Sequence, residues 1–407
     1  MKNVLLLFFG LLGFGAHSQM YMDQTDTTAF GQELSIQTIG DYGASSMQNG
    51  VVNRFFLGGF IDSTLKNNSM SRHSAVNRIG LNAGGQLVYR NANKRLLKKK
   101  DWGFEIAAGT NYFGGVLYGQ DAFGLAFFGN QSYVGDTMVL SGMDASFTAM
   151  QKVGFGFFDI KSKSSVRLNL YNISNRFDAD FRDFELRQSD DGYELTLDMD
   201  GDVTMGQSAK FNQGFGVGFD FNFRFPISWI KGDNAFLQMK GQNLGFGYMY
   251  EAQRKYSFDT TIVYDGFTFN QLLSDNGYFS NDISVLDTLG IRSEDANPIF
   301  LLPGYLQVSK MVDNNSEKQL QSFFGLRVYP TLIFSPLGFA GADYRFNEHI
   351  HAGASVTFGG FSGLRVGAYG QFNWSKFAVG IGSDNFSGFG RAGGNGTSMY
   401  LNLVCRF

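Results

Sequence analysis

Residues that can support catalysis or metal binding are few and scattered in this chain of 407 residues. His349 and His351 are two positions apart and so share one face of a strand, but no cluster of cysteine, histidine or carboxylate residues with metal-ligand spacing accompanies them. Ser355 shares that face, yet it is about 13 Å from His351, too far for a nucleophile and its base. We interpret the histidines as turn and lumen residues, and we expect no catalytic residues, no metal site and no cofactor.

Two further patterns resemble ligand sites only in part. Asp198, Asp200 and Asp202 are spaced like the start of a calcium-binding loop, but such a loop ends in a bidentate glutamate, and its twelfth position here is Ala209. We therefore interpret the aspartates as a tight acidic turn. The glycines of 214–218 resemble a nucleotide-binding fingerprint, but no helix is predicted after them, so they indicate a strand.

The end of the chain shows the element that organises the rest. An apolar set alternates there with Ser398, Asn402 and Arg406, and the chain stops at an aromatic residue. The apolar set is Met399, Leu401, Leu403, Cys405 and Phe407. Because successive strand residues point to opposite faces, one face suits lipid and the other a barrel interior. The pattern predicts the closing strand of an outer-membrane β-barrel, although the last strand of a soluble β-sandwich would alternate equally well.

The beginning of the chain favours the barrel. Lys2 precedes an apolar run from Val4 to Phe14, and small residues follow up to Ser18. This is the pattern of a cleaved secretory signal peptide, residues 1–18, and the run is too short to span a bilayer. The only cysteine is Cys405, which excludes a lipoprotein start and any disulfide within the chain. We expect the mature protein in a Gram-negative outer membrane.

Composition supports the same class. The chain has 53 Gly, 44 Phe and 18 Tyr but only 5 Pro, and its net charge of -3 gives no electrostatic reason to expect nucleic acid as a partner. Barrel strands escape hydropathy scans because each lipid-facing residue has polar or small neighbours. We predict an all-β fold, a single transmembrane antiparallel up-and-down β-barrel of about 14 strands, within a range of 12–16.

The clearest strand is Phe215 to Phe225. Its phenylalanines, including Phe219 and Phe221, alternate with glycines and polar residues. We predict that the phenylalanines face lipid and that the polar set faces the lumen. The lumen-facing candidates on this strand and on the C-terminal strands are Asp220, Asn222, Arg224, Asp343, Arg345, Arg365, Tyr369 and Gln371.

The same alternation divides the chain. We predict a signal peptide at 1–18, an N-terminal extension or plug at 19–50, and the barrel at 51–407 with a long loop at 264–300. The first barrel strand is expected near Phe55 to Ile61. The segment from Phe184 to Met199 is predicted as a hairpin reaching beyond the membrane, because its charges are too dense for a bilayer.

The glycine-and-aromatic segments resemble an outer-membrane barrel family of the Bacteroidota that is known only as a domain of unknown function, similar in architecture to the FadL and PorV barrels. The matching segments are SFTAMQKVGFGFF from Ser146, FGVGFDFNFRF from Phe215, QNLGFGY from Gln242, PGYLQV from Pro303 and VGIGSDNF from Val379. The resemblance implies a porin-like fold and an outer-membrane location, and no catalytic residues. The sequence GASSMQNG, Gly43 to Gly50, stands where FadL-type barrels have an asparagine-proline-alanine run, which argues against a FadL-like hatch.

Two functions stay open from the sequence. One is a structural or accessory subunit of an outer-membrane machine for secretion, surface-protein handling or barrel assembly; the other is a passive or FadL-like transport channel for small or hydrophobic solutes. The expected partners are outer-membrane lipid, the barrel-assembly machinery through the C-terminal strand, and other outer-membrane proteins. Aromatic residues of the long loop are partner-binding candidates: Phe267, Phe269, Tyr278 and Phe279.

Overall fold

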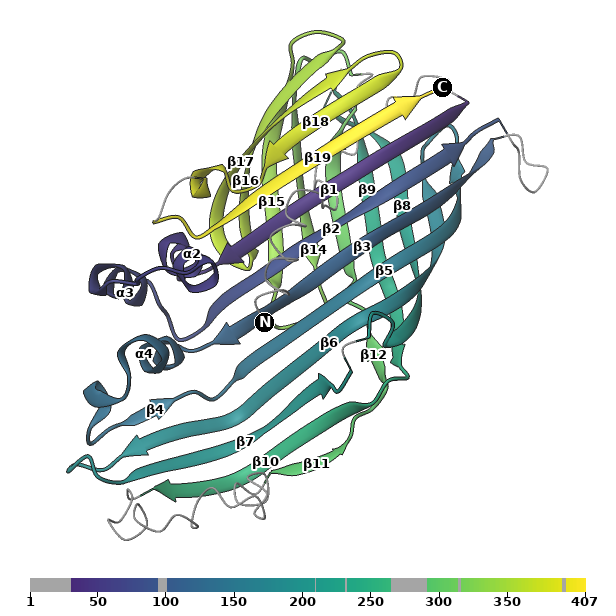
Figure 1. Ribbon diagram of the computed structural model, residues 1–407. Helices are drawn as coiled ribbons and strands as arrows, with labels where there is room; N and C mark the ends of the chain where they lie inside the picture. Colours follow the sequence, from purple (N-terminus) through teal and green to yellow (C-terminus); the bar gives the residue numbers. More distant parts are fainter. Residues whose placement is uncertain are drawn as a thin grey trace.

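The computed structural model describes residues 31–93, 101–208, 210–230, 233–264, 291–313, 316–389 and 393–407 (Figure 1). The predicted signal peptide and the aromatic residues of the long loop, Phe267, Phe269, Tyr278 and Phe279, lie outside these ranges. Within them no helix is long and apolar enough to span a membrane.

The described elements are mostly strands. The longer strands of the first half are β1 (Gln32–Ala44), β2 (Asn77–Asn91), β3 (Trp102–Tyr118), β5 (Met143–Asp159), β6 (Ser165–Gln188), β7 (Leu195–Gly206), β8 (Gly214–Ile230), β9 (Asp233–Met249) and β10 (Gln253–Tyr264). The second half has β13 (Tyr305–Val312), β14 (Leu320–Val328), β15 (Ser335–Arg345), β16 (Ile350–Gly360), β17 (Ser362–Asn373), β18 (Phe377–Ser383) and β19 (Gly396–Arg406). The short elements are β4 (Thr137–Val139), β11 (Arg292–Asp295), β12 (Ile299–Leu301), α2 (Asn49–Leu57), α3 (Ser63–Met70), α4 (Gln120–Phe128), η2 (Gln131–Tyr133) and η3 (Phe386–Gly388).

The main strands close into an antiparallel barrel of 14 strands, which confirms the predicted fold class. The order around the wall is β1, β2, β3, β5, β6, β8, β9, β13 and then β14 to β19 in sequence. Pairing of β19 with β1 completes the ring, with Arg406 opposite Glu33 and Gly396 opposite Gly43. Closure leaves no unpaired edge in the wall, which a bilayer requires.

The first wall strand lies inside the segment predicted as an extension or plug. β1 occupies Gln32–Ala44, where it pairs with β19 on one side and β2 on the other. The barrel therefore begins at Gln32 and not at residue 51. The sequence concealed this strand because Thr38 and Gly40 interrupt its outward apolar side, while Ile39 is buried on the inward side.

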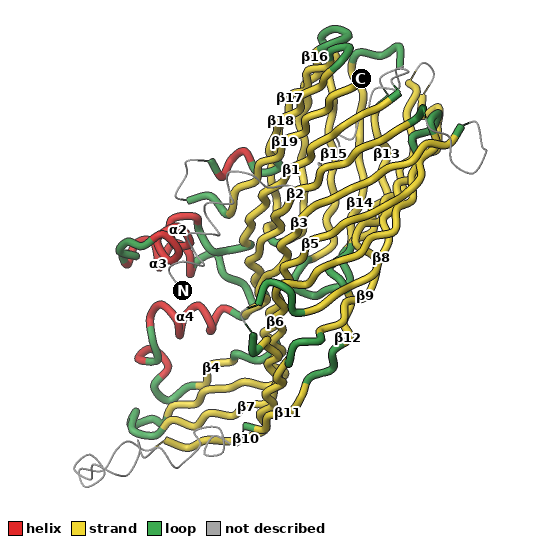
Figure 2. The backbone as a smooth tube through the Cα atoms, turned by 45° about the vertical axis from the view of Figure 1, so that its right-hand side comes forward, coloured by secondary structure: helices red, strands yellow, loops and turns green. Residues whose placement is uncertain are grey.

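The strand predicted at Phe55 to Ile61 is wrong. These residues include the last turn of α2, which ends before Gly58, a residue with φ of 91° that only glycine adopts readily. α3 follows, and the Asp62 side chain caps it by accepting a hydrogen bond of 2.9 Å from the backbone N–H of Leu65. The helices α2, α3 and α4 lie outside the wall at one end of the barrel (Figure 2).

Beyond the same end, the sheet continues past the closed wall on one side only. The distal half of β6 pairs with β7, β7 pairs with β10, and β10 pairs with the short β11, so that these strands form an extension sheet (Figure 1). The predicted hairpin is the β6–β7 pair. Asp198, Asp200 and Asp202 lie on one face of β7 instead of in a tight turn. The segment 264–300, predicted as a long loop, contains strands: Tyr264 ends β10 and β11 follows in this sheet, on the rim opposite Phe407, whereas β12 pairs with the wall strand β9.

Candidate functional site

The barrel interior is the candidate site, because a continuous chain of charged side chains crosses it. Lys152 Nζ lies 2.9 Å from Asp220 Oδ2 and donates at 2.9 Å to Asn243 Oδ1. The Arg167 guanidinium contacts Asp220 Oδ2 at 2.6 Å and Glu105 Oε1 at 3.4 Å. All of these side chains are buried. Buried charges are tolerated only when they are paired, and here each carboxylate meets at least one cation.

The chain of charges continues toward the seam where the barrel closes. Arg90 lies 3.0 Å from Glu105 Oε2 and 3.5 Å from Glu33 Oε1. Arg406 Nε then lies 3.6 Å from Glu33 Oε2. From Asn243 to Arg406, each member stands on a different strand, in the order β9, β5, β8, β6, β3, β2, β1 and β19. We call this set the ion-pair chain; it connects the inner surfaces of eight neighbouring wall strands.

A second group of polar contacts occupies the remaining interior. Arg365 Nη1 lies 2.8 Å from Asp41 Oδ1, and His351 Nδ1 lies 3.5 Å from Asp343 Oδ2. Arg327 donates to Gln307 Oε1 at 2.8 and 3.0 Å. These side chains come from β13 to β17 on one side of the barrel, except for Asp41, which comes from β1. The interior is therefore crossed by paired charges from both sides.

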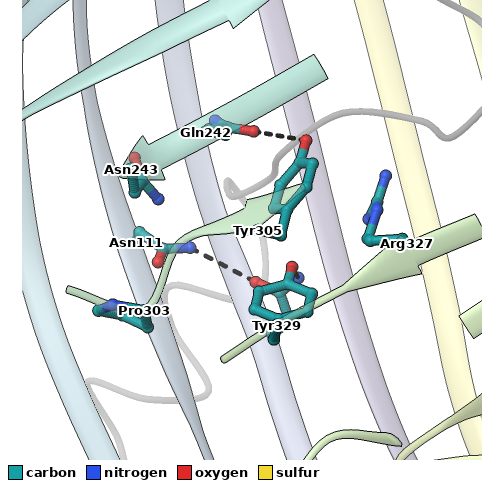
Figure 3. Close-up of a pocket in the computed structure, with 8 residues that line it drawn as sticks. Asn111, Gln242, Asn243, Pro303, Tyr305, Arg327 and Tyr329 are labelled. Atoms are coloured by element: carbon teal, nitrogen blue, oxygen red, sulfur yellow. Dashed lines mark hydrogen bonds between the residues drawn. The ribbon is translucent and has the colours of Figure 1, made fainter. Parts of the chain in front are cut away.

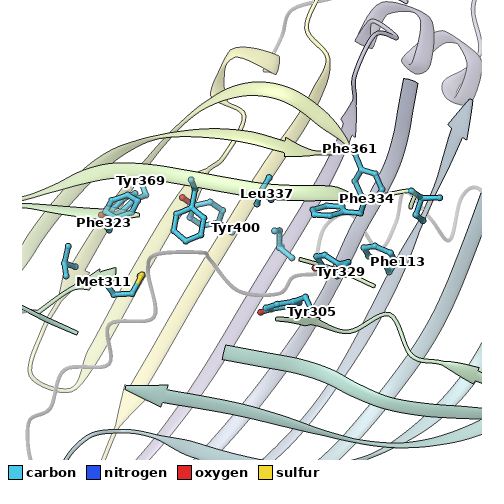
Figure 4. Close-up of a cluster of buried hydrophobic side chains, with 14 residues drawn as sticks. Phe113, Tyr305, Met311, Phe323, Tyr329, Phe334, Leu337, Phe361, Tyr369 and Tyr400 are labelled. Atoms are coloured by element: carbon cyan, nitrogen blue, oxygen red, sulfur yellow. The ribbon is translucent and has the colours of Figure 1, made fainter. Parts of the chain in front are cut away.

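Aromatic side chains pack against one another inside the barrel, nearer the rim that carries the helices. Tyr329 and Phe334 come from the segment between β14 and β15, and they pack on each other with ring centroids 4.5 Å apart. Phe113 on β3 stacks on Tyr329 at 4.8 Å, and Phe361, between β16 and β17, meets Phe334 edge-on at 4.9 Å. Figure 4 shows these rings from separate elements converging. We call these four residues the aromatic lid; it is part of a larger buried cluster that reaches Tyr369 and Tyr400.

A small polar cavity lies beside the lid (Figure 3). Its volume is about 10 Å³, comparable to the space that a single water requires. Tyr305 donates to Gln242 Oε1 at 2.7 Å, and Asn111 donates to Asn82 Oδ1 at 3.4 Å. The lining residues are Asn82, Asn111, Gln242, Asn243, Pro303, Tyr305, Arg327 and Tyr329. In this conformation the cavity could hold a single water molecule but not an organic solute.

The structure places the predicted lumen candidates as follows. Asp220 joins the ion-pair chain, Asn222 accepts a hydrogen bond of 2.8 Å from Gln238, and Arg224 lies 5.1 Å from the ring of Phe236. Four candidates on the C-terminal strands are buried: Arg365 beside Asp41, Asp343 beside His351, Tyr369 in the aromatic cluster, and Gln371 beside Asn373. Arg345, at the end of β15, is half-buried and donates to the carbonyl of Ser316 at 2.8 Å. On the closing strand Met399, Cys405 and Phe407 are exposed outward, and Leu401 and Leu403 are half-exposed.

Sequence reasoning missed most of the ion-pair chain. Glu105 and Arg167 each have an apolar residue on both sides, as in Phe104-Glu105-Ile106, and Lys152 lies between Gln151 and Val153. A lone charge inside an alternating segment was the available signal, because it fixes which face of the strand is inward. Within the described residues, no group of three potential metal ligands is present.

Comparisons with known proteins add only similarity of architecture. No protein-family model matches the sequence, and no curated protein matches it. The toluene transporter TodX of Pseudomonas putida covers 94% of this chain and 91% of its own, with 9% identity and a TM-score of 0.41. The toluene transporter TbuX of Ralstonia pickettii is 9% identical, covers 93% of this chain and 90% of its own, and has a TM-score of 0.40. The translocator domain of the autotransporter NalP of Neisseria meningitidis is 9% identical, covers 100% of this chain and 98% of its own, and has a TM-score of 0.30. At these TM-scores the likenesses support no conclusion about function, and the resemblance to a Bacteroidota family stays a prediction.

Proposed function

We propose that this chain is a non-enzymatic, integral barrel of a Gram-negative outer membrane whose own side chains close its lumen. In this proposal it is a structural or accessory subunit of an outer-membrane complex and not an open pore. The observation that carries the proposal is the filled interior. The members of the ion-pair chain and of the aromatic lid are buried, except for Arg90 and Glu33, which are half-buried, whereas side chains that line a water-filled channel would stay exposed.

The outer surface supports the membrane location. Large apolar side chains point outward from strand after strand around the wall, and they are exposed in the isolated chain. Examples are Leu168, 60% exposed, Phe246, 62%, Phe358, 67%, and Leu364, 70%. Apolar surface in water costs about 25 cal/mol per Å², and a continuous belt of it is typical of lipid contact. The inward neighbours of these residues are small or polar, as in the Arg167–Leu168 pair.

Partner binding is proposed for the extension sheet, which lies at the rim that carries the helices. These elements are more than barrel closure requires, since the wall closes without β4, β7, β10, β11 and the helices. The segment 264–300, with Phe267, Phe269, Tyr278 and Phe279, stays a candidate contact surface, and its first residue, Tyr264, is the last residue of β10 in this sheet. The machines that we consider are those for secretion, surface-protein handling and barrel assembly.

A transport channel is the second candidate, and the origin of the lid favours it. Tyr329 and Phe334 belong to a connection between strands and not to the wall, and the polar cavity lies directly beside them. A connection can move without breaking wall hydrogen bonds. Transport would then require the segment 329–334 to leave the lumen and the ion-pair chain to separate.

Single-channel recording of the purified barrel in a planar bilayer tests the proposal. We expect no sustained conductance from the natural chain. A Tyr329→Gly/Phe334→Gly variant, with folding checked by heat-modifiable gel mobility, shows what an opened lid would give. Sustained conductance of the natural chain, at a level that this variant does not exceed, would overturn the closed-barrel proposal in favour of transport.

Deletion of residues 265–290 tests the partner role separately. We expect the shortened barrel to stay folded and impermeable and to lose neighbouring proteins that cross-link to the natural chain in cells. A rise in permeability and antibiotic sensitivity with every cross-linked partner retained would contradict the scaffold role and identify the segment as a plug.

A further inference from the structure

Four large apolar side chains are exposed at the tip of α2 and in the turn after it. Phe55 is 67% exposed, Phe56 48%, Leu57 62% and Phe60 83%. They fall within six consecutive positions around Gly58 and Gly59, and the rings of Phe55 and Phe56 pack edge to face at 5.4 Å. We call these four residues the α2 tip. Clustered apolar exposure of this kind marks an interaction surface and not chance variation.

The helices that carry the α2 tip are packed on the outside of the barrel wall. Val51 of α2 and Phe123 of α4 are buried in one cluster with Tyr118, and Ile79 and Val116 of the wall pack against it. Ile79 and Val116 are directly paired across β2 and β3, whereas their neighbours Gly80 and Gly115 approach Phe361 inside the lumen. Ile79 and Val116 therefore point outward, and the helices cover one end of the apolar outer surface, at the rim that carries them.

Hydrogen bonds hold α2 and α3 in place. We call residues 45–76, which include both helices, the helical cap. Asn49, at the start of α2, donates at 3.1 Å to the carbonyls of both Gly388 and Gly396, and its Oδ1 accepts from the N–H of Gly396 at 2.6 Å. Arg72, which follows α3, donates at 2.9 Å to the carbonyl of Gly393. The first half of α2 is buried by these contacts, and its second half is exposed. The α2 tip is thus held at a fixed place beside the belt.

The charge of the cap suits an anionic surface. Residues 45–76 contain Arg54, Lys66 and Arg72 but only one acidic residue, Asp62. The carboxylate of Asp62 already accepts the hydrogen bond that caps the N-terminus of α3. Lys66 lies 6.0 Å from the ring centroid of Phe128, another exposed aromatic at the end of α4. Aromatic side chains with neighbouring cations are typical of the boundary between acyl chains and phosphate groups.

We infer that the α2 tip inserts into the membrane leaflet at the rim that carries the helices, as an interfacial anchor beside β1 to β3. The lipid is its partner because the tip continues the lipid-facing surface on which the cap is packed. Arg54 and Lys66 then lie at the level of the lipid phosphates. This inference rests on the proposed membrane location.

Site-directed spin labelling measures the depth of the tip directly. In a Cys405→Ser background, a nitroxide label is attached after Phe60→Cys, and the barrel is reconstituted in vesicles of phosphatidylethanolamine and phosphatidylglycerol. Asn68→Cys, an exposed polar position on α3, is the aqueous control, and Leu168→Cys is the lipid control. Each variant is checked for heat-modifiable mobility. Collision rates with oxygen, which partitions into lipid, and with a water-soluble nickel chelate are compared.

We expect the oxygen-to-nickel ratio at Phe60 to exceed that at Asn68 about threefold or more and to fall below that at Leu168. Equal ratios at Phe60 and Asn68, with Leu168 in lipid, would overturn the anchor and leave the membrane barrel intact. An aqueous ratio at Leu168 would instead overturn the membrane location itself. Protection of the Phe60 label in native outer-membrane fragments but not in pure lipid vesicles would show that the tip binds a protein, which also overturns the inference.

Discussion

Arg365 on β17 and Asp41 on β1 form an ion pair of 2.8 Å across the lumen, although β18 and β19 separate their strands in the wall. Both side chains are almost fully buried, at 3% and 7% exposure. The pair therefore joins, through the barrel interior, two strands that share no backbone hydrogen bonds. It connects the closing end of the sheet with its first strand.

Breaking this pair on one side is expected to be costly. Asp41→Asn removes the negative charge that lies 2.8 Å from the buried guanidinium of Arg365, and we expect a loss of about 3–5 kcal/mol in the free energy of unfolding. The double variant Asp41→Leu/Arg365→Leu should recover most of that loss, because apolar residues remove the desolvation penalty together with the attraction. Urea unfolding in lipid vesicles measures both. Asp259→Asn, at an exposed carboxylate of β10, is the matched control, and a loss as large in that control would contradict the assignment.

The two faces of β8 are expected to respond differently to charge. Phe219 points outward, 47% exposed, whereas Asn222 is buried in the lumen. Phe219→Arg should cost about 2–4 kcal/mol if the residue lies near the bilayer midplane, and Phe221→Arg should behave similarly. Asn222→Asp should be tolerated far better, since its neighbour is the donor Gln238. The fraction of folded barrel on heat-modifiable gels reports each effect, and equal losses would show that the faces are assigned wrongly.

The extension sheet is expected to lose stability in acid. Partial burial of Asp202 opposes its ionisation, but hydrogen bonds from Ser257, Arg182 and Lys255 prevail and lower its pKa to about 2. Arg182 also bonds to Asp200 at 2.6 and 3.0 Å. Because the folded pKa lies below the ordinary value of 3.8, this contribution is complete above about pH 4 and is lost as pH falls toward 2.

Arg182→Gln tests the same contacts at neutral pH. We expect faster hydrogen–deuterium exchange in β7 and unchanged exchange in the wall strands, and high salt should reduce the difference between the variant and the natural chain. Lys161→Gln, at an exposed pair with Asp101 on the opposite rim, is the control. Uniform acceleration throughout the barrel would contradict a local role for Arg182.

The helical cap is expected to loosen below neutral pH. Burial lowers the pKa of His73, although a hydrogen bond to the carbonyl of Ser69 opposes this shift. Its other ring nitrogen lies 3.1 Å from the hydroxyl of Tyr118. Since the unfolded segment binds a proton more readily, stability falls as pH drops below about 6.5 and through the lowered pKa.

Hydrogen–deuterium exchange of residues 45–76 at pH 7.5 and pH 5 measures this effect. The acid form should exchange faster in the cap while β8 and β9 stay protected, and His73→Asn, which retains a polar side chain, should remove the difference. The account fails if the pH dependence persists in that variant.

Alternation along the strands was enough to predict the fold and part of the site. Phe215 to Phe225 shows both faces without interruption, so Asp220, Asn222 and Arg224 could be placed in the lumen from spacing alone. Phe55 to Ile61 could not be assigned in the same way, because a short apolar run fits a helix as well as a strand.

The partners of the inward charges were beyond reach from the sequence. Arg167 meets Asp220 and Glu105 because β6 lies beside β8, and because β5 alone separates it from β3. β6 can pair with β8 only because β7, which lies between them in the sequence, belongs to the extension sheet and not to the wall. The residue pattern of β7 alone does not predict this. Strand order and register are properties of the closed ring, and they decide which charges meet.

The ion-pair chain also bears on how the barrel assembles. A strand that pairs one residue out of register turns every side chain to the opposite face, so Glu105 or Arg167 would enter lipid, at a cost of about 2–4 kcal/mol for the arginine. A slip of two residues keeps the charge inside but separates it from its partner, which stands on the next strand for Arg90 and Glu105 and on the next but one for Arg167 and Glu105. Because one polar side chain stands on each of eight neighbouring strands, every seam among them carries its own penalty for mispairing. The charges thus discriminate against wrongly closed rings throughout half of the circumference, a selection that the uniform apolar exterior does not provide.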